Sequence, residues 1–262
     1  MKTRLISAIV MIMLFIPILL LGDIYYVVFS SIVGLMGLWE LLRLEKKIPS
    51  YMKLLSYFIC LFLILYNYNS LDYFNIINFP IVVGIFLIYS LSIIINGDLS
   101  NYNYKDSIYL MSCVIIIGLL FNGFIKLRMI NILFVIYSFT ISITTDTFAY
   151  IGGRLFGKHK LSPSISPNKT VEGSIIGSVM GTIVSSIFYY FIIGKLDILL
   201  IILMGFILSI LSQVGDLFFS SIKRYYKVKD YSNLIPGHGG ILDRLDSILF
   251  VILGFLMYSL YV

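Results

Sequence analysis

Charged residues are scarce in this chain: they make up 12% of its 262 residues, whereas 60% are hydrophobic. A soluble domain averages about 25% charged residues, so the composition excludes a soluble protein and predicts a polytopic membrane protein. Cysteine is also rare, and Cys60 and Cys113 each stand alone within an apolar run. They show no CxxC or metal-ligand spacing, so the sequence contains no cysteine-based metal or redox motif.

Long apolar runs take the place of the missing charge. A membrane-spanning helix needs about 20 apolar residues, and the chain predicts an all-α fold with about nine such helices plus an interfacial amphipathic helix. The first run resembles a signal peptide, but it is longer than usual and no small-x-small cleavage site follows, so we expect a retained helix. The predicted spans lie near residues 5–21, 24–42, 53–66, 74–95, 107–125, 130–151, 171–194, 196–215 and 246–262.

No repeat or long linker divides the chain, and we expect one integral membrane domain. Residues 1–130 are predicted to be plain transmembrane helices, whereas residues 131–262 carry ordered polar patterns and form the predicted catalytic region. Four of the 19 Lys and Arg residues lie in the connection 152–172 and five more in the connection 215–246. Because positive loops stay on the cytoplasmic side, both connections and the N-terminus are expected inside, and the C-terminus outside.

Carboxylates stand at the ends of several apolar runs. An ionised carboxylate at membrane depth is costly unless it is paired or binds a cation. Asp216 is expected to end its helix, where the helix dipole disfavours negative charge. We therefore expect a basic side chain or a metal ion beside its carboxylate. For Asp246, capping of the last helix is the alternative. Helical spacing gives three polar faces: Ser138, Ser142, Thr145 and Asp146; Ser209, Gln213, Asp216 and Ser220; and Asp243, Asp246 and Ser247.

Glycines recur every fourth residue at Gly173, Gly177 and Gly181, followed by Ser185. This spacing lets a neighbouring backbone approach closely. The neighbour is either another helix of the same chain or a second copy in a homodimer, and the sequence leaves both open.

The stretch 217–232, LFFSSIKRYYKVKDYS, is too polar to span a membrane. On a helical wheel Lys223, Arg224 and Lys227 share one side, which predicts a helix at the membrane interface with its basic side toward phosphates. A positive-inside anchor without a specific partner is the alternative. After it, His238 stands between two glycines, where backbone can approach an anion closely.

The stretch GGRLFGKH, residues 152–159, contains G-x-x-x-x-G-K. A P-loop requires Ser or Thr where His159 stands, and it requires a strand before it, so we exclude that fold. Arg154 and Lys158 remain candidates for phosphate binding. Ser166 or Thr170 is predicted to cap the next helix, whose free N–H groups favour an anion.

The segment 220–246, SSIKRYYKVKDYSNLIPGHGGILDRLD, resembles the signature of the phosphatidate cytidylyltransferase (CDP-diacylglycerol synthase) family. The pieces DTFAYIGGRLFGK, SPNKTVEG and QVGD are also similar to that family, although Asn168 stands where many relatives have lysine. The resemblance implies a helical enzyme of a bacterial inner membrane that converts CTP and phosphatidate into CDP-diacylglycerol and pyrophosphate. It also implies a Mg²⁺ cofactor, with a second cation left open, and a polar cavity that opens to the cytosol and to lipid. No nucleic-acid partner is expected.

The resemblance also implies roles for the polar residues. Asp216 and Asp243 are expected to bind the metal, and Asp246 and Asp146 are further candidate ligands. Lys223 and Arg224 are expected to hold a substrate phosphate, and His238 to donate to a phosphate oxygen. The other candidates are expected to bind or orient the substrates: Arg154, Lys158, Lys169, Gln213, Ser220, Lys227, Lys229 and Arg244. Two rivals stay open, a CTP-dependent lipid kinase and a cation-coupled transporter, since the latter also places carboxylates in membrane helices.

Overall fold

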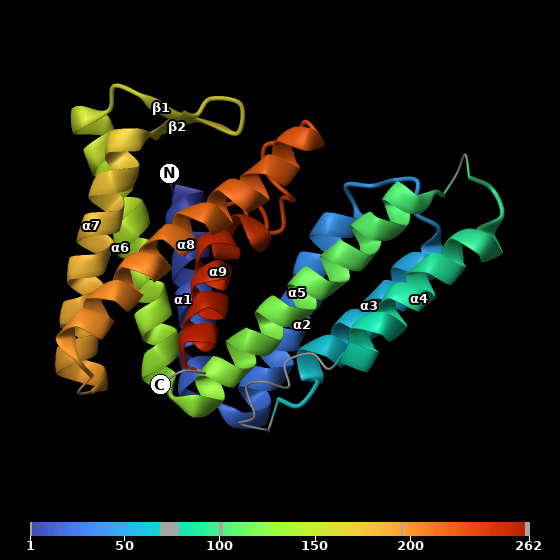
Figure 1. Cartoon of the computed structure of the whole chain (residues 1–262), viewed down its shortest axis with the longest axis horizontal. Coiled ribbons are helices and arrows are strands. Elements are labelled where there is room, and N and C mark those ends of the chain that lie inside the picture. Colours follow the sequence, from blue (N-terminus) through green and yellow to red (C-terminus); the bar gives the residue numbers. More distant parts are fainter. Residues whose placement is uncertain (1, 69–78, 100–101, 195, 260–262) are drawn as a thin grey trace. The chain divides into compact units, whose positions relative to one another are not determined.

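The computed structural model describes residues 2–68, 79–99, 102–194 and 196–259, and within them it contains nine α-helices and one β-hairpin (Figure 1). The helices are α1 (Lys2–Leu21), α2 (Asp23–Leu42), α3 (Ser50–Leu65), α4 (Phe79–Asn96), α5 (Tyr104–Ile130), α6 (Ile132–Phe156), α7 (Val171–Phe188), α8 (Ile198–Tyr225) and α9 (Leu242–Ser259). The hairpin strands are β1 (Lys160–Ser162) and β2 (Ser166–Thr170), and the π-helical turn η2 (Tyr189–Ile193) extends α7. The predicted all-α class is confirmed.

Each predicted span corresponds mainly to one helix in the described part of the chain, while residues 74–78 and 260–262 of the fourth and ninth spans lie outside it. Five helical segments are long and apolar enough to cross a membrane: α2, α5, α6, α7 with η2, and α8. The apolar parts of α1, α3 and α4 are shorter, at 10–17 residues. These segments identify a polytopic helical membrane protein.

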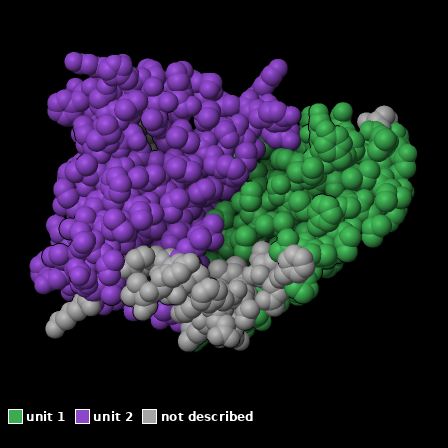
Figure 2. Space-filling view, in the orientation of Figure 1, with its two compact units in different colours: residues 1–126, 231–241 green, residues 127–230, 242–262 purple. Residues whose placement is uncertain are grey.

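The chain forms two compact units (Figure 2). Unit 1 comprises residues 1–126 and the loop 231–241, and unit 2 comprises residues 127–230 and 242–262. Unit 1 therefore contains α1 to α4, most of α5 and the glycine-rich loop that links α8 to α9. Unit 2 contains α6 to α9 and the β-hairpin.

Small residues and polar contacts hold the helices of unit 1 together. Gly34 of α2 faces Phe121 of α5 so closely that a Cβ at this glycine would lie 3.0 Å from the ring. Asn122 of α5 donates its amide protons to backbone oxygens at the end of α3, including those of Ile64 at 2.9 Å and Tyr66 at 2.8 Å. These carbonyl groups have no partner within their own helix, so Asn122 both satisfies them and fixes α3 against α5.

In unit 2, α6 and α7 pack at close range because glycine lines the contact. A Cβ at Gly177 would lie 2.8 Å from the Cβ of Ala149, closer than real side chains come. Gly173 and Gly181 meet α6 in the same way. The predicted close approach is therefore confirmed, and the neighbour is a helix of the same chain.

Helix α8 runs without a break from Ile198 to Tyr225, and two predictions are wrong as a result. Residues 217–225 continue this helix and residues 226–232 form turns and bends, so these residues do not form a separate interfacial helix. Asp216 lies inside α8 rather than at its end. The expected break followed the loss of apolar residues, but the helix continues because Lys223 is buried against an acidic partner.

Candidate active site

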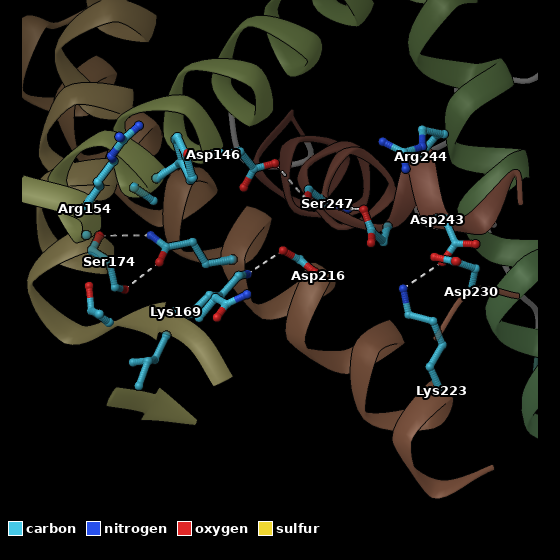
Figure 3. Close-up of a pocket in the computed structure, with 18 residues that line it drawn as sticks. Asp146, Arg154, Lys169, Ser174, Asp216, Lys223, Asp230, Asp243, Arg244 and Ser247 are labelled. Atoms are coloured by element: carbon cyan, nitrogen blue, oxygen red, sulfur yellow. Dashed lines mark hydrogen bonds and ion pairs between the residues drawn. The ribbon is translucent and has the colours of Figure 1, made fainter. Parts of the chain in front are cut away.

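A cavity of about 560 Å³ lies in unit 2, among α6, the hairpin, α7, α8 and the start of α9 (Figure 3). Acidic and basic side chains from separate segments line its walls. The predicted site residues that line it are Asp146, Arg154, Lys169, Gln213, Asp216, Lys223, Asp243, Arg244 and Asp246. The fold thus brings most of the predicted carboxylates and cations to one place.

The β-hairpin forms one wall of this cavity. Its strands pair antiparallel, with Lys160 opposite Thr170. Thr170, rather than Ser166, caps α7, because its Oγ1 accepts a hydrogen bond from the N–H of Gly173 at 3.2 Å. Glu172, in the first turn of α7, accepts hydrogen bonds from the backbone at the base of the hairpin, including the N–H of Lys158 at 3.0 Å. The hairpin is therefore tied to the N-terminus of α7 on both of its ends.

Lys169 projects from β2 and forms an ion pair with Asp216 of α8. Both side chains are partly exposed, at 27% and 25%. Ser220 lies one turn further along α8 and donates to Oδ1 of Asp216 at 3.2 Å. Asp216 therefore has a basic partner inside the protein, and Ser220 orients its carboxylate.

Lys223 and Asp243 form a second ion pair, which is more deeply buried. Nζ of Lys223 lies 2.7 Å from Oδ1 of Asp243, and the two side chains are 10% and 4% exposed. The lysine stands in the last turn of α8 and the aspartate in the first turn of α9. Both positions agree with the helix dipoles, which favour a cation at the C-terminus and an anion at the N-terminus.

Asp146 of α6 and Asp246 of α9 meet at Ser247. The hydroxyl oxygen of Ser247 lies 3.1 Å from Oδ2 of Asp146 and 3.5 Å from Oδ1 of Asp246. Asp216 interacts electrostatically with both carboxylates, and Figure 3 shows its side chain in the same part of the cavity as Asp146. Negative charge from three helices therefore converges on the cavity, and such a cluster attracts a cation.

Gln213 fastens α7 to α8 beside the cavity. Its Oε1 accepts from the hydroxyl of Ser174 at 2.5 Å, and its Nε2 donates to the hydroxyl of Ser178 at 2.8 Å and to the carbonyl of Ser174 at 3.2 Å. Because Gln213 is only 7% exposed, these bonds satisfy a largely buried amide. Its clearest role is to fix the two helices that carry Ser174 and Asp216.

Some predicted residues do not take part in the lining as far as the described residues define it. Arg224 turns toward the hairpin and donates to the carbonyl oxygen of Ile165 at 3.1 Å. His238 belongs to unit 1, where its Nδ1 lies 2.7 Å from the hydroxyl oxygen of Ser7. The full set of predicted residues outside the lining is Lys158, Ser220, Arg224, Lys227, Lys229 and His238.

Other lining residues were not predicted as site residues. Tyr150 and Gly153 follow Asp146 at i+4 and i+7 on α6, so the helical period would have found both. Ser174 lines the cavity at the start of α7, and Asp230 adds a further carboxylate from the loop after α8. No helical spacing links these two to the predicted faces. Asp230 nevertheless lies within the segment 220–246 that resembles the family signature, and that resemblance could have indicated it.

The carboxylates have the chemistry of a magnesium site but do not form a complete cage. Among the residues that the structure describes, no three acidic, histidine or cysteine side chains are grouped closely enough to hold a metal. Mg²⁺ usually binds through one or two carboxylates and completes its shell with water and substrate phosphates. Asp216, with Asp146 and Asp246 as its acidic neighbours, fits such a partial ligand set.

The sequence is similar to known proteins along almost its whole length. A family model described as "Cytidylyltransferase family" matches residues 2–262. A protein of Staphylococcus haemolyticus named phosphatidate cytidylyltransferase is 37% identical over 257 residues. Proteins of the same name from Staphylococcus epidermidis and Staphylococcus aureus are 35% identical, and each alignment covers 96% of this chain and 96% of the relative. Because the model and the relatives match almost the whole length, the chain belongs to the cytidylyltransferase family.

Proposed function

We propose that this chain transfers the cytidylyl group of CTP to phosphatidate, giving CDP-diacylglycerol and pyrophosphate for phospholipid biosynthesis. The observation that carries the proposal is the cavity in which Lys169 pairs with Asp216 and Lys223 pairs with Asp243. Such a surface offers ammonium groups to phosphates and carboxylate oxygens to a bridging cation. The names of the staphylococcal relatives support the same activity.

The proposed reaction is a displacement at the α-phosphorus of CTP. A phosphate oxygen of phosphatidate forms a bond to that phosphorus, the bond to the bridging oxygen of the β-phosphate breaks, and pyrophosphate leaves with the electron pair. The attacking oxygen is already anionic, so no strong base is needed. Because one anion attacks another, positioning and charge neutralisation account for most of the rate enhancement.

The basic lining residues supply this neutralisation. Lys169 and Lys223 are held by carboxylates, and either ammonium group can turn to a phosphate oxygen when substrate enters the cavity. Arg154 and Arg244 also line the cavity and offer further donors. Guanidinium groups suit phosphates because they donate two parallel hydrogen bonds.

A Mg²⁺ cofactor belongs to the same proposal. Asp216 and Asp243 would hold it, with Asp146 and Asp246 as further oxygen ligands. When bound, Mg²⁺ supplies positive charge to the phosphate oxygens of CTP and to the departing pyrophosphate. Ser220 and Ser247 fix the carboxylates in place through their hydroxyl groups.

We also propose that all nine helices cross a bacterial inner membrane, with the N-terminus and the cavity on the cytosolic side. The basic residues within 152–172 and 215–246 support this orientation. Water-soluble CTP then meets a lipid that stays in the bilayer. A homodimer is not needed to explain the glycine spacing, since Gly177 packs on α6 of the same chain.

The products test the proposed reaction directly. Purified protein in lipid nanodiscs is incubated with phosphatidate, Mg²⁺ and CTP labelled in the cytosine ring. We expect the label in CDP-diacylglycerol, with one pyrophosphate released per lipid. Labelled free CDP together with a newly phosphorylated lipid would instead identify a kinase. Ion flux without CTP consumption, measured with the same protein in sealed liposomes, would identify a transporter.

A further inference from the structure

The loop 231–241 of unit 1 has a defined shape of its own. The carbonyl of Ile235 accepts from the N–H of His238 at 2.9 Å, which closes a turn over Pro236 and Gly237. Gly237 has φ of 76°, and proline followed by a positive-φ glycine is the pattern of a type II turn. The N–H of Ile235 also bonds the carbonyl of Gly239 at 2.8 Å. Backbone hydrogen bonds thus fix the turn that carries His238.

Glu40 of α2 ties the two ends of this loop together. Its Oε1 accepts from the hydroxyl of Ser232 at 2.6 Å and from the N–H of Ile241 at 2.8 Å, across 192 and 201 residues of sequence. Ser232 in turn accepts from the N–H of Leu234 at 3.3 Å. One carboxylate therefore fixes both the entry and the exit of the loop.

The space around this carboxylate is closed. Glu40 is 0% exposed, and a Cβ at Gly240 would lie 2.8 Å from Oε2 of Glu40. Position 240 therefore requires glycine because of a side chain on α2. Burying a carboxylate is costly even when it is hydrogen-bonded, and an apolar residue would fill the same space at lower cost. Packing alone does not account for a glutamate here.

A second contact acts on the imidazole itself. The hydroxyl of Ser7 donates to the carbonyl of Pro236 at 3.0 Å and lies 2.7 Å from Nδ1 of His238. The Ser7 hydroxyl is therefore held between the backbone of the turn and the imidazole ring. Helix α1 therefore orients the ring that the turn presents.

We propose that Glu40 is a positioning residue for cytidylyl transfer: by holding both ends of loop 231–241, it sets the place and orientation of His238. This inference rests on the proposed function and on the expectation, from the family resemblance, that His238 donates to a phosphate oxygen. The Glu40 side chain must be long enough for one oxygen to contact both Ser232 and Ile241. Its length therefore matters more than its charge.

Three substitutions of Glu40 distinguish the effect of its side-chain length from the effect of its charge. Glu40→Asp keeps the charge but shortens the side chain by one methylene, and Glu40→Gln keeps the length and an acceptor oxygen but loses the charge. We expect Glu40→Asp and Glu40→Ala to lower kcat by about a hundredfold, as for a misplacement of about 1 Å that is caused by a mutation far from the chemistry. Glu40→Gln should lose much less. KM for CTP should stay near the wild-type value, because Lys169 and Arg154 are untouched. Glu45→Gln is the control, since it removes the charge of a partly exposed carboxylate that accepts from the N–H of nearby Lys47.

Gly240→Ala examines the same contact from the loop. In the wild type the added methyl collides with Glu40, whereas in Glu40→Ala it has room. We expect the substitution to lower kcat by at least about tenfold alone and by less in the double variant, because residues in contact are not additive. Hydrogen exchange at the amides of 232–241 should be faster in Glu40→Asp than in the wild type, and unchanged at the hairpin 160–170.

The outcomes separate the two proposals. A wild-type protein that forms no CDP-diacylglycerol refutes the proposed function, and the exchange rates then still test whether Glu40 holds the loop. An active wild type with full kcat in Glu40→Asp, or with strictly additive effects of Glu40→Ala and Gly240→Ala, overturns the role of Glu40. If Glu40→Ala fails to fold, as judged by size exclusion, the comparison of the Asp and Gln variants decides.

Discussion

Lys169 of the β-hairpin and Asp216 of α8 form an ion pair that fastens the hairpin across the cavity of unit 2. The contact joins a candidate phosphate-binding cation to a candidate metal ligand. In the absence of substrate, the lysine neutralises the carboxylate at little cost, since both groups keep some exposure to water. When substrates bind, a phosphate would contact Lys169 and a divalent cation would contact Asp216. We therefore expect substrate binding to be coupled to the position of the hairpin.

Replacing the carboxylate of Asp216 tests its chemical role. We expect Asp216→Asn to lower kcat/KM by at least about a hundredfold, because it removes a charge that neutralises the reacting phosphates through a cation. The folded state should persist, since asparagine preserves the size of the side chain and can still accept from Ser220. CDP-diacylglycerol formation is measured across a range of Mg²⁺ concentrations.

Asp197→Asn is the matched control, because this exposed residue caps the start of the same helix. Asparagine caps as well as aspartate does, so activity should not change. Near-normal turnover of Asp216→Asn at ordinary Mg²⁺ would refute the assignment of Asp216 to the metal.

Removal of the metal should stop the reaction without unfolding the protein. Excess EDTA is expected to abolish turnover, and added Mg²⁺ to restore it. The melting temperature in detergent should hardly change, because Lys169 and Lys223 already neutralise Asp216 and Asp243 in the protein alone. A large fall in melting temperature with EDTA would contradict this, since it would show that the fold itself depends on the cation.

The sequence predicted the helices and most of the acidic cavity for a clear physical reason. Apolar runs of membrane length and helical periodicity are local properties, and they placed Asp146, Asp216, Asp243 and Asp246 on helix faces that the structure brings to one cavity. The family signature added the basic residues around Lys223. Local pattern and tertiary structure agree here because each polar face must avoid lipid.

The wrong predictions come from contacts between distant segments. The end of α8 was misplaced because hydropathy does not reveal that Lys223 is buried against Asp243, which lets the polar turn stay helical. Likewise, nothing near Glu40 in sequence indicates that its carboxylate binds Ser232 and Ile241. Pairings over such separations depend on the packed fold and not on local period.

Substitutions of Lys223 and Asp243 distinguish the contribution of this pair to stability from its contribution to catalysis. Breaking a buried pair by removing one partner should cost about 3–5 kcal/mol, because the other charge stays buried and uncompensated. Lys223→Met and Asp243→Leu should therefore each lower the melting temperature, whereas the double variant should recover much of it. All three variants should lose activity, since each removes from the cavity the cation, the carboxylate or both. Thermal unfolding and CDP-diacylglycerol formation are measured on the same preparations. Recovery of turnover in the double variant would show that the two residues serve the fold alone.

The remaining basic residues of the signature provide the last test. Lys227 and Lys229 follow α8, are exposed, and are not among the residues that line the described cavity. We expect Lys227→Ala and Lys229→Ala each to change stability by no more than about 0.5 kcal/mol, as for other surface substitutions. Their effect on kcat should be far smaller than that of Lys223→Ala. The three variants are compared for kcat and for KM of CTP and of phosphatidate. A loss in Lys229→Ala as large as in Lys223→Ala would mean that the loop after α8 moves into the cavity during turnover, and that the lysine then contacts substrate.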